Sequence, residues 1–187
     1  MARNKRTQDR DEKRAEIVAT ALKLFVDDGY DSTSIGKLAS AAGITTNTIY
    51  WYFQDKDAVL VEVLNMLVAA AYSEYETAQT TTLTDRVLWL VGKLEKISEL
   101  VNTVHARALV SDAVRIWHNN FHAAIDAILS YELAQQLARQ ASVTDTQLNA
   151  LAKIWTFTIE GILSHQLSDV DKRAMCETLA QQLDAYR

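Results

Sequence analysis

The feature that most constrains the fold is the near absence of residues that interrupt helices. The chain has 187 residues, with no proline and only five glycines. Proline inside a helix removes a backbone hydrogen bond and clashes with the preceding turn, so a chain without it has little to break its helices. Apolar residues make up 49% of the sequence, enough to fill the core of one large or two small domains. We therefore predict an all-α protein.

Apolar residues recur at helical spacing through most of the chain, which predicts several amphipathic helices. Threonines at 80–82 break the long face that begins after Phe53, and a new helix is expected to start near Thr84. The predicted helical runs are about 11 to 28, 35 to 42, 45 to 53, 55 to 79, 83 to 101, 105 to 117, 119 to 140, 144 to 166 and 170 to 186.

The stretch Ser34–Lys56, SIGKLASAAGITTNTIYWYFQDK, predicts two short helices joined by a tight turn. Ser34 is a suitable N-cap for the first helix, and Gly43 ends it because glycine adopts the left-handed conformation without strain. Thr45 can cap a second helix only two residues later. Two helices joined within three or four residues have the geometry of a helix-turn-helix.

The second of these helices presents an unusual surface to solvent. Only Ile49 and Phe53 are needed on its inner side. Small hydroxyls, an amide and amphipathic rings of this kind can reach base edges in a DNA major groove. The alternative is a polar, partly aromatic helix that covers a core. The outward residues are Thr45, Thr46, Asn47, Thr48, Tyr50, Trp51 and Tyr52.

The pattern GYDSTSIGKLASAAGITTNTIYWYFQDKDAVL resembles the DNA-binding region of the tetracycline-repressor (TetR-like) family of transcription regulators. The resemblance covers about residues 13 to 64. It implies a three-helix helix-turn-helix DNA-binding domain at residues 1–54, followed by a helical bundle at 55–187 for effector binding and dimerisation. Asn47 stands where the family often has a small residue, and Tyr52 where it often has histidine, so the preferred operator is left open.

Roles in DNA binding follow from position and from the resemblance. We expect Thr45, Thr46, Asn47, Thr48 and Tyr50 to face bases, with Trp51 beside them, and Ser34, Tyr52 and Lys56 to hold phosphates. Residues 1–60 carry no net charge, whereas residues 61–187 carry −5. The first fourteen residues form a basic arm, which either contacts phosphates or remains solvated and disordered. Its cations are Arg3, Lys5, Arg6, Arg10, Lys13 and Arg14.

The second domain carries large amphipathic side chains that either line a pocket for a small, mostly apolar molecule or form an ordinary core. No catalytic signature is present, so we expect neither an enzyme nor a cofactor. His118, His122 and Asp126 share a helix face, but we expect pocket-lining or surface roles and no metal. The candidate pocket residues are Trp89, His105, Trp117, Phe121, His122, Trp155 and Glu160.

The last two predicted helices are apolar on more than one side, so each needs more than one partner. In the resembling family these helices meet a two-fold mate in a four-helix bundle, which implies a homodimer through about 144–186. The alternative is that they only close the core of the monomer. Two symmetric reading helices would address half-sites of a palindrome about 34–36 Å apart or more.

Taken together, these features predict a ligand-responsive transcription regulator. The resemblance favours a repressor that a small effector releases from its operator. The alternatives are a DNA-binding dimer without an effector, or a helical carrier or enzyme. The single cysteine, Cys176, and the charged N-terminus indicate a cytoplasmic protein without a membrane partner.

Overall fold

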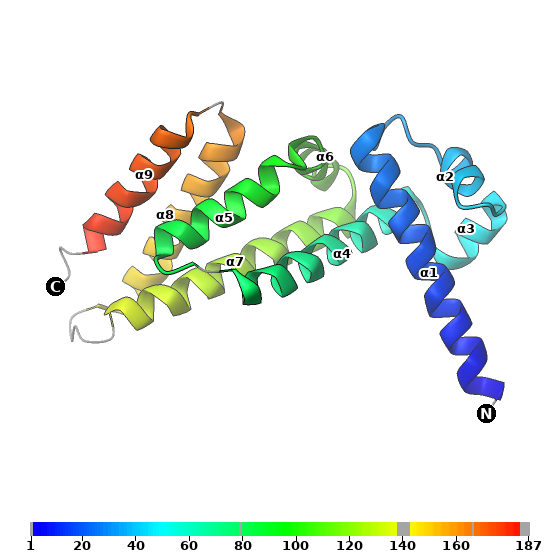
Figure 1. The fold of residues 1–187 in the computed structure, drawn as a ribbon, viewed down its shortest axis with the longest axis horizontal. Coiled ribbons are helices and arrows are strands. Elements are labelled where there is room, and N and C mark those ends of the chain that lie inside the picture. Colours follow the sequence, from blue (N-terminus) through cyan, green and yellow to red (C-terminus); the bar gives the residue numbers. More distant parts are fainter. Residues whose placement is uncertain (1, 79, 138–142, 166, 184–187) are drawn as a thin grey trace. The chain divides into compact units, whose positions relative to one another are not determined.

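The computed structural model describes the backbone of residues 2–78, 80–137, 143–165 and 167–183, and the side chains of these residues except 2–8 and 76. Within these ranges the regular structure is helical, with no strand (Figure 1). The all-α prediction is confirmed. The helices are α1 (Ala2–Asp27), α2 (Ile35–Ala41), α3 (Thr46–Tyr52), α4 (Lys56–Thr77), α5 (Leu83–Glu95), α6 (Ser98–Ala108), α7 (Asp112–Leu137), α8 (Asp145–Ser164) and α9 (Asp169–Gln182).

The chain divides into two compact units, and the first contains residues 1–77 and 99–118. In this unit α1 packs against both α2 and α4. The apolar face of α1 that periodicity predicts is buried, with Ile17, Ala21 and Phe25 at or near zero exposure. Val59 and Leu60 on α4 are fully buried too. The domain boundary predicted at residues 54 and 55 stays a prediction.

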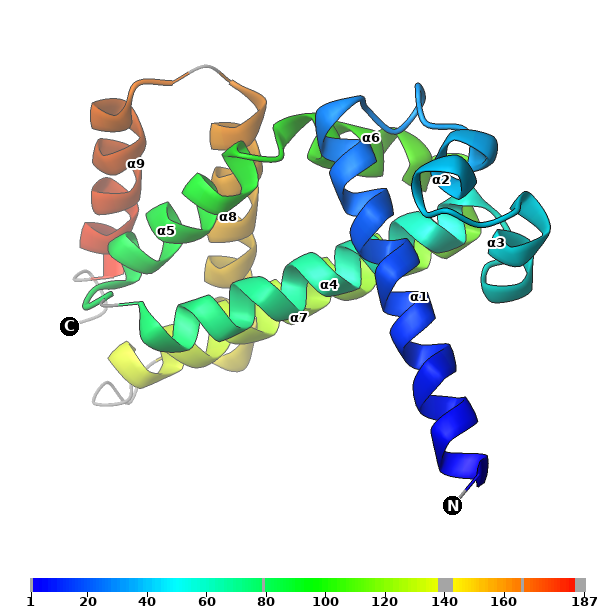
Figure 2. The same cartoon turned by 45° about the vertical axis from the view of Figure 1, so that its right-hand side comes forward.

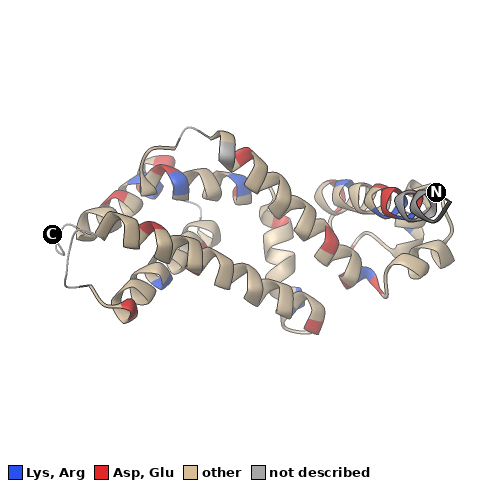
Figure 3. Cartoon of the chain, turned by 90° about the horizontal axis from the view of Figure 1, so that it is seen from below, with Lys and Arg blue, Asp and Glu red and all other residues tan. Residues whose placement is uncertain are grey.

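Helix α1 begins at Ala2, about nine residues earlier than predicted. No proline or glycine precedes Gly29, so the charged segment has no residue that breaks a helix. Figure 3 shows Lys and Arg interleaved with Asp and Glu along α1. Arg14 forms an ion pair with Glu62 of α4 at 2.9 Å. The side chains of Arg3, Lys5 and Arg6 lie outside the described residues.

The second unit contains residues 78–98 and 119–187. Here α5 contacts both α8 and α9, and α8 and α9 run antiparallel to each other (Figure 2). A hydrophobic core joins the four helices of this unit through Val91, Leu133, Trp155 and Cys176, all buried. Burial raises the pKa of the Cys176 thiol. Lys172 of α9 forms an ion pair with Glu95 of α5 at 2.5 Å.

Two helix boundaries in the middle of the chain were wrongly predicted. Helix α5 ends at Glu95, where a run to 101 was expected, and α7 is continuous through 118, where a break was expected. The actual break follows Ala108: the carbonyl of Arg107 accepts from the amides of both Val110 and Ser111. Because this turn contains only a few residues, the helical spacing of apolar residues continues across it. Periodicity alone therefore does not locate the turn.

Helix α4 is the one described helix that is long and apolar enough to cross a membrane. By length and composition its span is Lys56–Tyr75, with a mean hydropathy of 1.3, and 22% of that window is buried. The buried residues include Val59, Leu60 and Val63, which face the interior of the first unit. Core helices of soluble proteins meet the same criteria, so this span is weak support for a membrane segment.

Candidate nucleic-acid interface

Helices α2 and α3 form the predicted helix-turn-helix, and local side chains fix both starts. The hydroxyl of Ser34 accepts from the amide of Lys37 at 3.1 Å, and that of Thr45 accepts from the amide of Thr48 at 3.2 Å. Gly43 lies between the helices with φ at +65°, in the left-handed region that glycine tolerates. The predicted caps and turn are confirmed.

Helix α3 buries one side and exposes the other. Ile49 is fully buried, and Phe53 just after the helix is 4% exposed. Tyr50 and Trp51 are 55% and 62% exposed. Thr45, Thr46 and Asn47 are also exposed, whereas Thr48 and Tyr52 are half-buried. The side chains assigned to bases therefore lie mostly on the solvent side of α3, and their contacts with bases stay a prediction.

Trp51 is less free than its position on α3 implies. Its ring packs edge-on against Tyr52 at a centroid distance of 4.7 Å. The guanidinium of Arg10 lies over the same ring, 4.7 Å from its centroid. A cation over an indole face is attracted by the ring quadrupole. Arg10, from the predicted basic arm, is thus placed beside α3 by an aromatic contact.

Lys56, the predicted phosphate ligand, has internal contacts that sequence reasoning missed. Its ammonium donates to the backbone carbonyl of Tyr30 at 2.9 Å and lies 3.9 Å from the centroid of the Tyr30 ring. Burial lowers the pKa of Lys56, although Asp31 acts in the opposite direction. A phosphate contact at Lys56 stays a prediction, as do those at Ser34, which is exposed, and at half-buried Tyr52.

Tyr30 also belongs to a buried polar cluster that joins α4 to α6. The Tyr30 hydroxyl donates to Asp57 at 2.5 Å, and Arg107 donates to both oxygens of the same carboxylate at 3.0 and 2.6 Å. Burial alone raises the pKa of Asp57, but the hydrogen bonds from Arg107, Tyr30 and Ser111 outweigh it, and the net pKa is lowered. Burial, followed by the bond to Asp57, raises the pKa of Tyr30.

Asp57 lies in the first turn of α4 and pairs with a residue distant in the sequence. The residue that caps α4 is Asp55, whose carboxylate accepts from the amide of Ala58 at 2.8 Å. Asp57 instead pairs with Arg107, fifty residues further along the chain. A single sequence does not show which of its charged residues pair at that separation, so the Asp57–Arg107 pair could not be predicted.

The candidate pocket residues occupy several kinds of environment. Trp155 is 1% exposed within the core of the second unit. Trp89 is half-buried with the ammonium of Lys93 5.3 Å from its ring centroid. Trp117, in the first unit, donates to Asn65 at 2.8 Å. Trp155 therefore occupies a core position, and the pocket as a whole stays a prediction.

The remaining pocket candidates are polar or aromatic residues of α6, α7 and α8. His105 is exposed, and Phe121 contacts His122 with ring centroids 6.0 Å apart. An oxygen of Glu160 lies 3.4 Å from Nε2 of His122. Asp126 accepts from the hydroxyl of Thr156 at 2.6 Å, so its carboxylate is directed to α8.

Comparison with known proteins agrees with this geometry. Residues 17–63 match the family described as bacterial regulatory proteins, tetR family. The chain is 46% identical over 63 residues to the HTH-type transcriptional regulator AcrR of Shigella flexneri, which covers 34% of this chain and 29% of AcrR. It is 25% identical over 183 residues to the HTH-type transcriptional regulator SrpR of Pseudomonas putida, covering 93% of this chain and 84% of SrpR. The chain thus spans less than a third of AcrR, though most of SrpR.

Solved structures share the fold over nearly the whole chain. A TetR transcription regulator from Haloarcula marismortui is 17% identical with a TM-score of 0.68, covering 94% of this chain and 96% of that one. A protein assigned as a transcriptional regulator from Saccharomonospora viridis, in complex with choline, is 20% identical with a TM-score of 0.71, covering 91% and 96%. The family match at residues 17–63, the capped helix pair and the shared fold agree, and residues 17–63 of the chain carry a domain of the tetR family of bacterial regulatory proteins.

Proposed function

We propose that the protein is a transcription regulator that binds operator DNA as a homodimer and responds to a small effector. The observation that carries this proposal is the two-sided character of α3. Ile49 anchors the helix in the core, while Asn47 and Tyr50 remain on the exposed side. Exposed amide, hydroxyl and aromatic groups on a rigid short helix suit hydrogen bonding to base edges in a major groove.

The test of DNA reading is selection of bound sequences from a random duplex pool at one fixed salt concentration. The expected result is enrichment of a palindrome, because two reading helices related by two-fold symmetry bind two half-sites. Asn47→Ala should change the enriched bases. The matched control is Asn102→Ala, which removes the same amide from an exposed site on α6. No enrichment by folded protein would reject the proposal.

Exposed apolar side chains on α8 and α9 support a homodimer through about 144–186, of which 166 and 184–186 lie outside the described residues. On α8, Trp155 and Ile159 face the core, while Ile154 and Phe157 are 46% and 65% exposed. On α9, Val170 is 77% exposed. Apolar groups on a second face of each helix favour burial against another chain, because removing that area from water stabilises association.

Sedimentation of a charged variant tests this interface. Phe157→Glu should give a monomer, since an unpaired carboxylate would be buried at the contact. Tyr72→Glu is the matched control, because Tyr72 is an equally exposed aromatic, at 64%, on α4. If the wild-type protein sediments as a monomer, or if Phe157→Glu leaves a dimer intact, the proposed interface is wrong.

Effector response would operate as a population shift in the dimer. A ligand bound by the C-terminal helices changes DNA affinity only if it binds the two states with different affinity. The Arg107–Asp57 pair supports this scheme, because it ties α6 to the first turn of α4, next to the helix-turn-helix.

Thermal melting with candidate compounds tests for an effector, since a ligand that prefers the folded state raises the melting temperature. The first compounds to test are small apolar molecules, because the second unit contains large aromatic residues. Choline is a further probe, because the structural neighbour from Saccharomonospora viridis is in complex with it. A compound that raises the melting temperature should also release the selected operator. A dimer that binds the operator and responds to no compound would favour the effector-independent alternative.

A further inference from the structure

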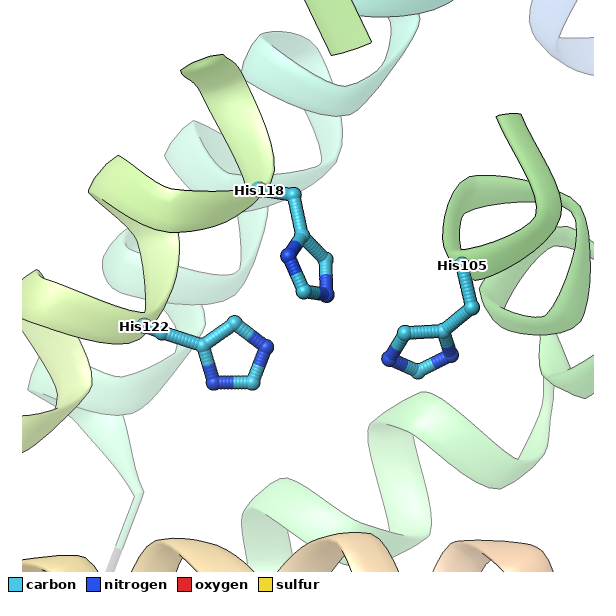
Figure 4. A group of neighbouring side chains, drawn as sticks. All are labelled: His105, His118 and His122. Carbon is cyan, nitrogen blue, oxygen red and sulfur yellow. The ribbon is translucent and has the colours of Figure 1, made fainter. Parts of the chain in front are cut away.

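Three histidines from two helices direct their rings into one space (Figure 4). His105 comes from α6, and His118 and His122 come from α7. The rings of His105 and His118 lie with centroids 5.0 Å apart and planes at 77°. One ring nitrogen from each of the three histidines can be chosen so that all lie within 4.8 Å of one another. The sequence grouped His118 and His122 with Asp126 instead, because spacing along one helix cannot reveal a contribution from α6.

Chain continuity fixes this grouping locally. His105 and His118 both belong to the first unit. His122 follows His118 by one turn on α7, which is unbroken from Asp112 to Leu137. Side chains four residues apart on a helix lie on the same face. His118 and His122 are therefore neighbours on one face of α7.

We propose that His105, His118 and His122 bind a divalent transition-metal ion of the zinc, cobalt and nickel class. Imidazole nitrogen suits these ions, whereas magnesium and calcium prefer oxygen ligands. A tetrahedral ion held at about 2.0–2.1 Å places its nitrogen ligands about 3.4 Å apart. The nitrogens of the three histidines must therefore close by at most ~1.4 Å, which rotation about side-chain bonds provides. A water or an effector atom would fill the fourth position.

Glu160 supports His122 in this role. Its carboxylate oxygen lies 3.4 Å from Nε2 of His122. Metal-binding histidines commonly hold their other nitrogen against a carboxylate, which orients the ring and makes the ligating nitrogen more basic. Glu160 is thus a positioning residue. Asp126 has no part in the site, because Thr156 and Lys153 occupy its oxygens.

The experiment is metal binding by protein that carries no added histidine tag, measured by titration calorimetry with Zn²⁺ and by the visible absorption of Co²⁺. The expected result is one ion per chain, with cobalt bands typical of tetrahedral nitrogen coordination. His118→Ala should weaken binding at least ~100-fold, since loss of a ligand exceeds the 10–100-fold effect of an outer partner. Glu160→Gln should weaken it about tenfold.

His165→Ala is the matched control, because His165 is the remaining one of the four histidines and lies at the end of α8. It should bind zinc as the wild type does. His105→Ala should lose binding as His118→Ala does, and His105 is exposed, so its removal leaves folding intact. Melting of each metal-free variant verifies the fold.

Three outcomes would overturn the proposal: no binding by the wild type, equal loss in His165→Ala, or full binding retained by His105→Ala. The measurement uses no DNA. The result for metal binding is therefore independent of whether the proposed regulatory function is correct.

Discussion

The helix-turn-helix of the first unit and the α8–α9 pair of the second are both made of helices, but their sequences specify them differently. In α2 and α3, two hydroxyl caps fix the first residue of each helix, and one left-handed glycine fixes the turn between them. All three lie within about twenty residues. In α8 and α9 the caps at Thr144 and Ser168 fix only where the helices begin. Which side of each helix faces the core depends on distant partners. Local signals thus define the helix-turn-helix, and tertiary packing defines the bundle.

The largest expected effect is at Trp155, where the bundle depends on packing. Trp155→Ala should lower the free energy of unfolding by about 3–5 kcal/mol, because a large buried side chain leaves a cavity. Denaturant unfolding measures the loss. Ile154→Ala, one position earlier and 46% exposed, should lose much less in a monomeric background such as Phe157→Glu. Equal losses at the two positions would contradict the assignment of faces.

The next effect concerns the polar cluster of the first unit. Asp57→Asn should lower the free energy of unfolding by about 2 kcal/mol near neutral pH, because Arg107 loses its buried partner and remains partly hydrated. The lowered pKa of Asp57 makes its contribution present above the unfolded pKa of about 3.9 and lost as pH falls through the folded pKa. The wild type and Asp57→Asn should therefore converge in acid. A difference that persists at low pH would exclude the carboxylate as its source.

A smaller effect tests whether the turn itself is locally determined. Gly43→Ala should cost about 1 kcal/mol, since a residue with a side chain is strained at a φ of +65°. No atom lies within 4 Å of an added Cβ, so the strain is purely of the backbone. Gly92→Ala, within α5, is the control and should be neutral or stabilising. Thermal melting compares the two variants.

The smallest effect concerns Lys56. Lys56→Ala should reduce the salt dependence of operator binding by about one unit of slope, since one phosphate contact is lost. Its contacts with Tyr30 add a small loss of stability, which melting without DNA measures separately. Lys23→Ala, on α1, provides the control for loss of a positive charge. An unchanged slope for Lys56→Ala would remove Lys56 from the DNA contacts.

The difference between the two regions also explains which predictions succeeded. Ser34, Gly43 and Thr45 were assigned correctly because a cap or a turn acts over three or four residues. The break between α6 and α7 was missed because a tight turn does not disturb apolar spacing. Asp57 with Arg107, and His105 with His118, were missed because each pair unites groups far apart along the chain. Pairings of that kind depend on how helices pack, which one sequence does not display.

The buried thiol of Cys176 makes the protein a convenient background for site-directed labelling. Its raised pKa and zero exposure suppress the thiolate that labelling reagents attack, and it is the one cysteine in the chain. A cysteine introduced at exposed Ser40 on α2 would therefore be the reactive site. Spin labels attached there in a dimer would report the separation of the two helix-turn-helix units directly, with and without zinc or a candidate effector.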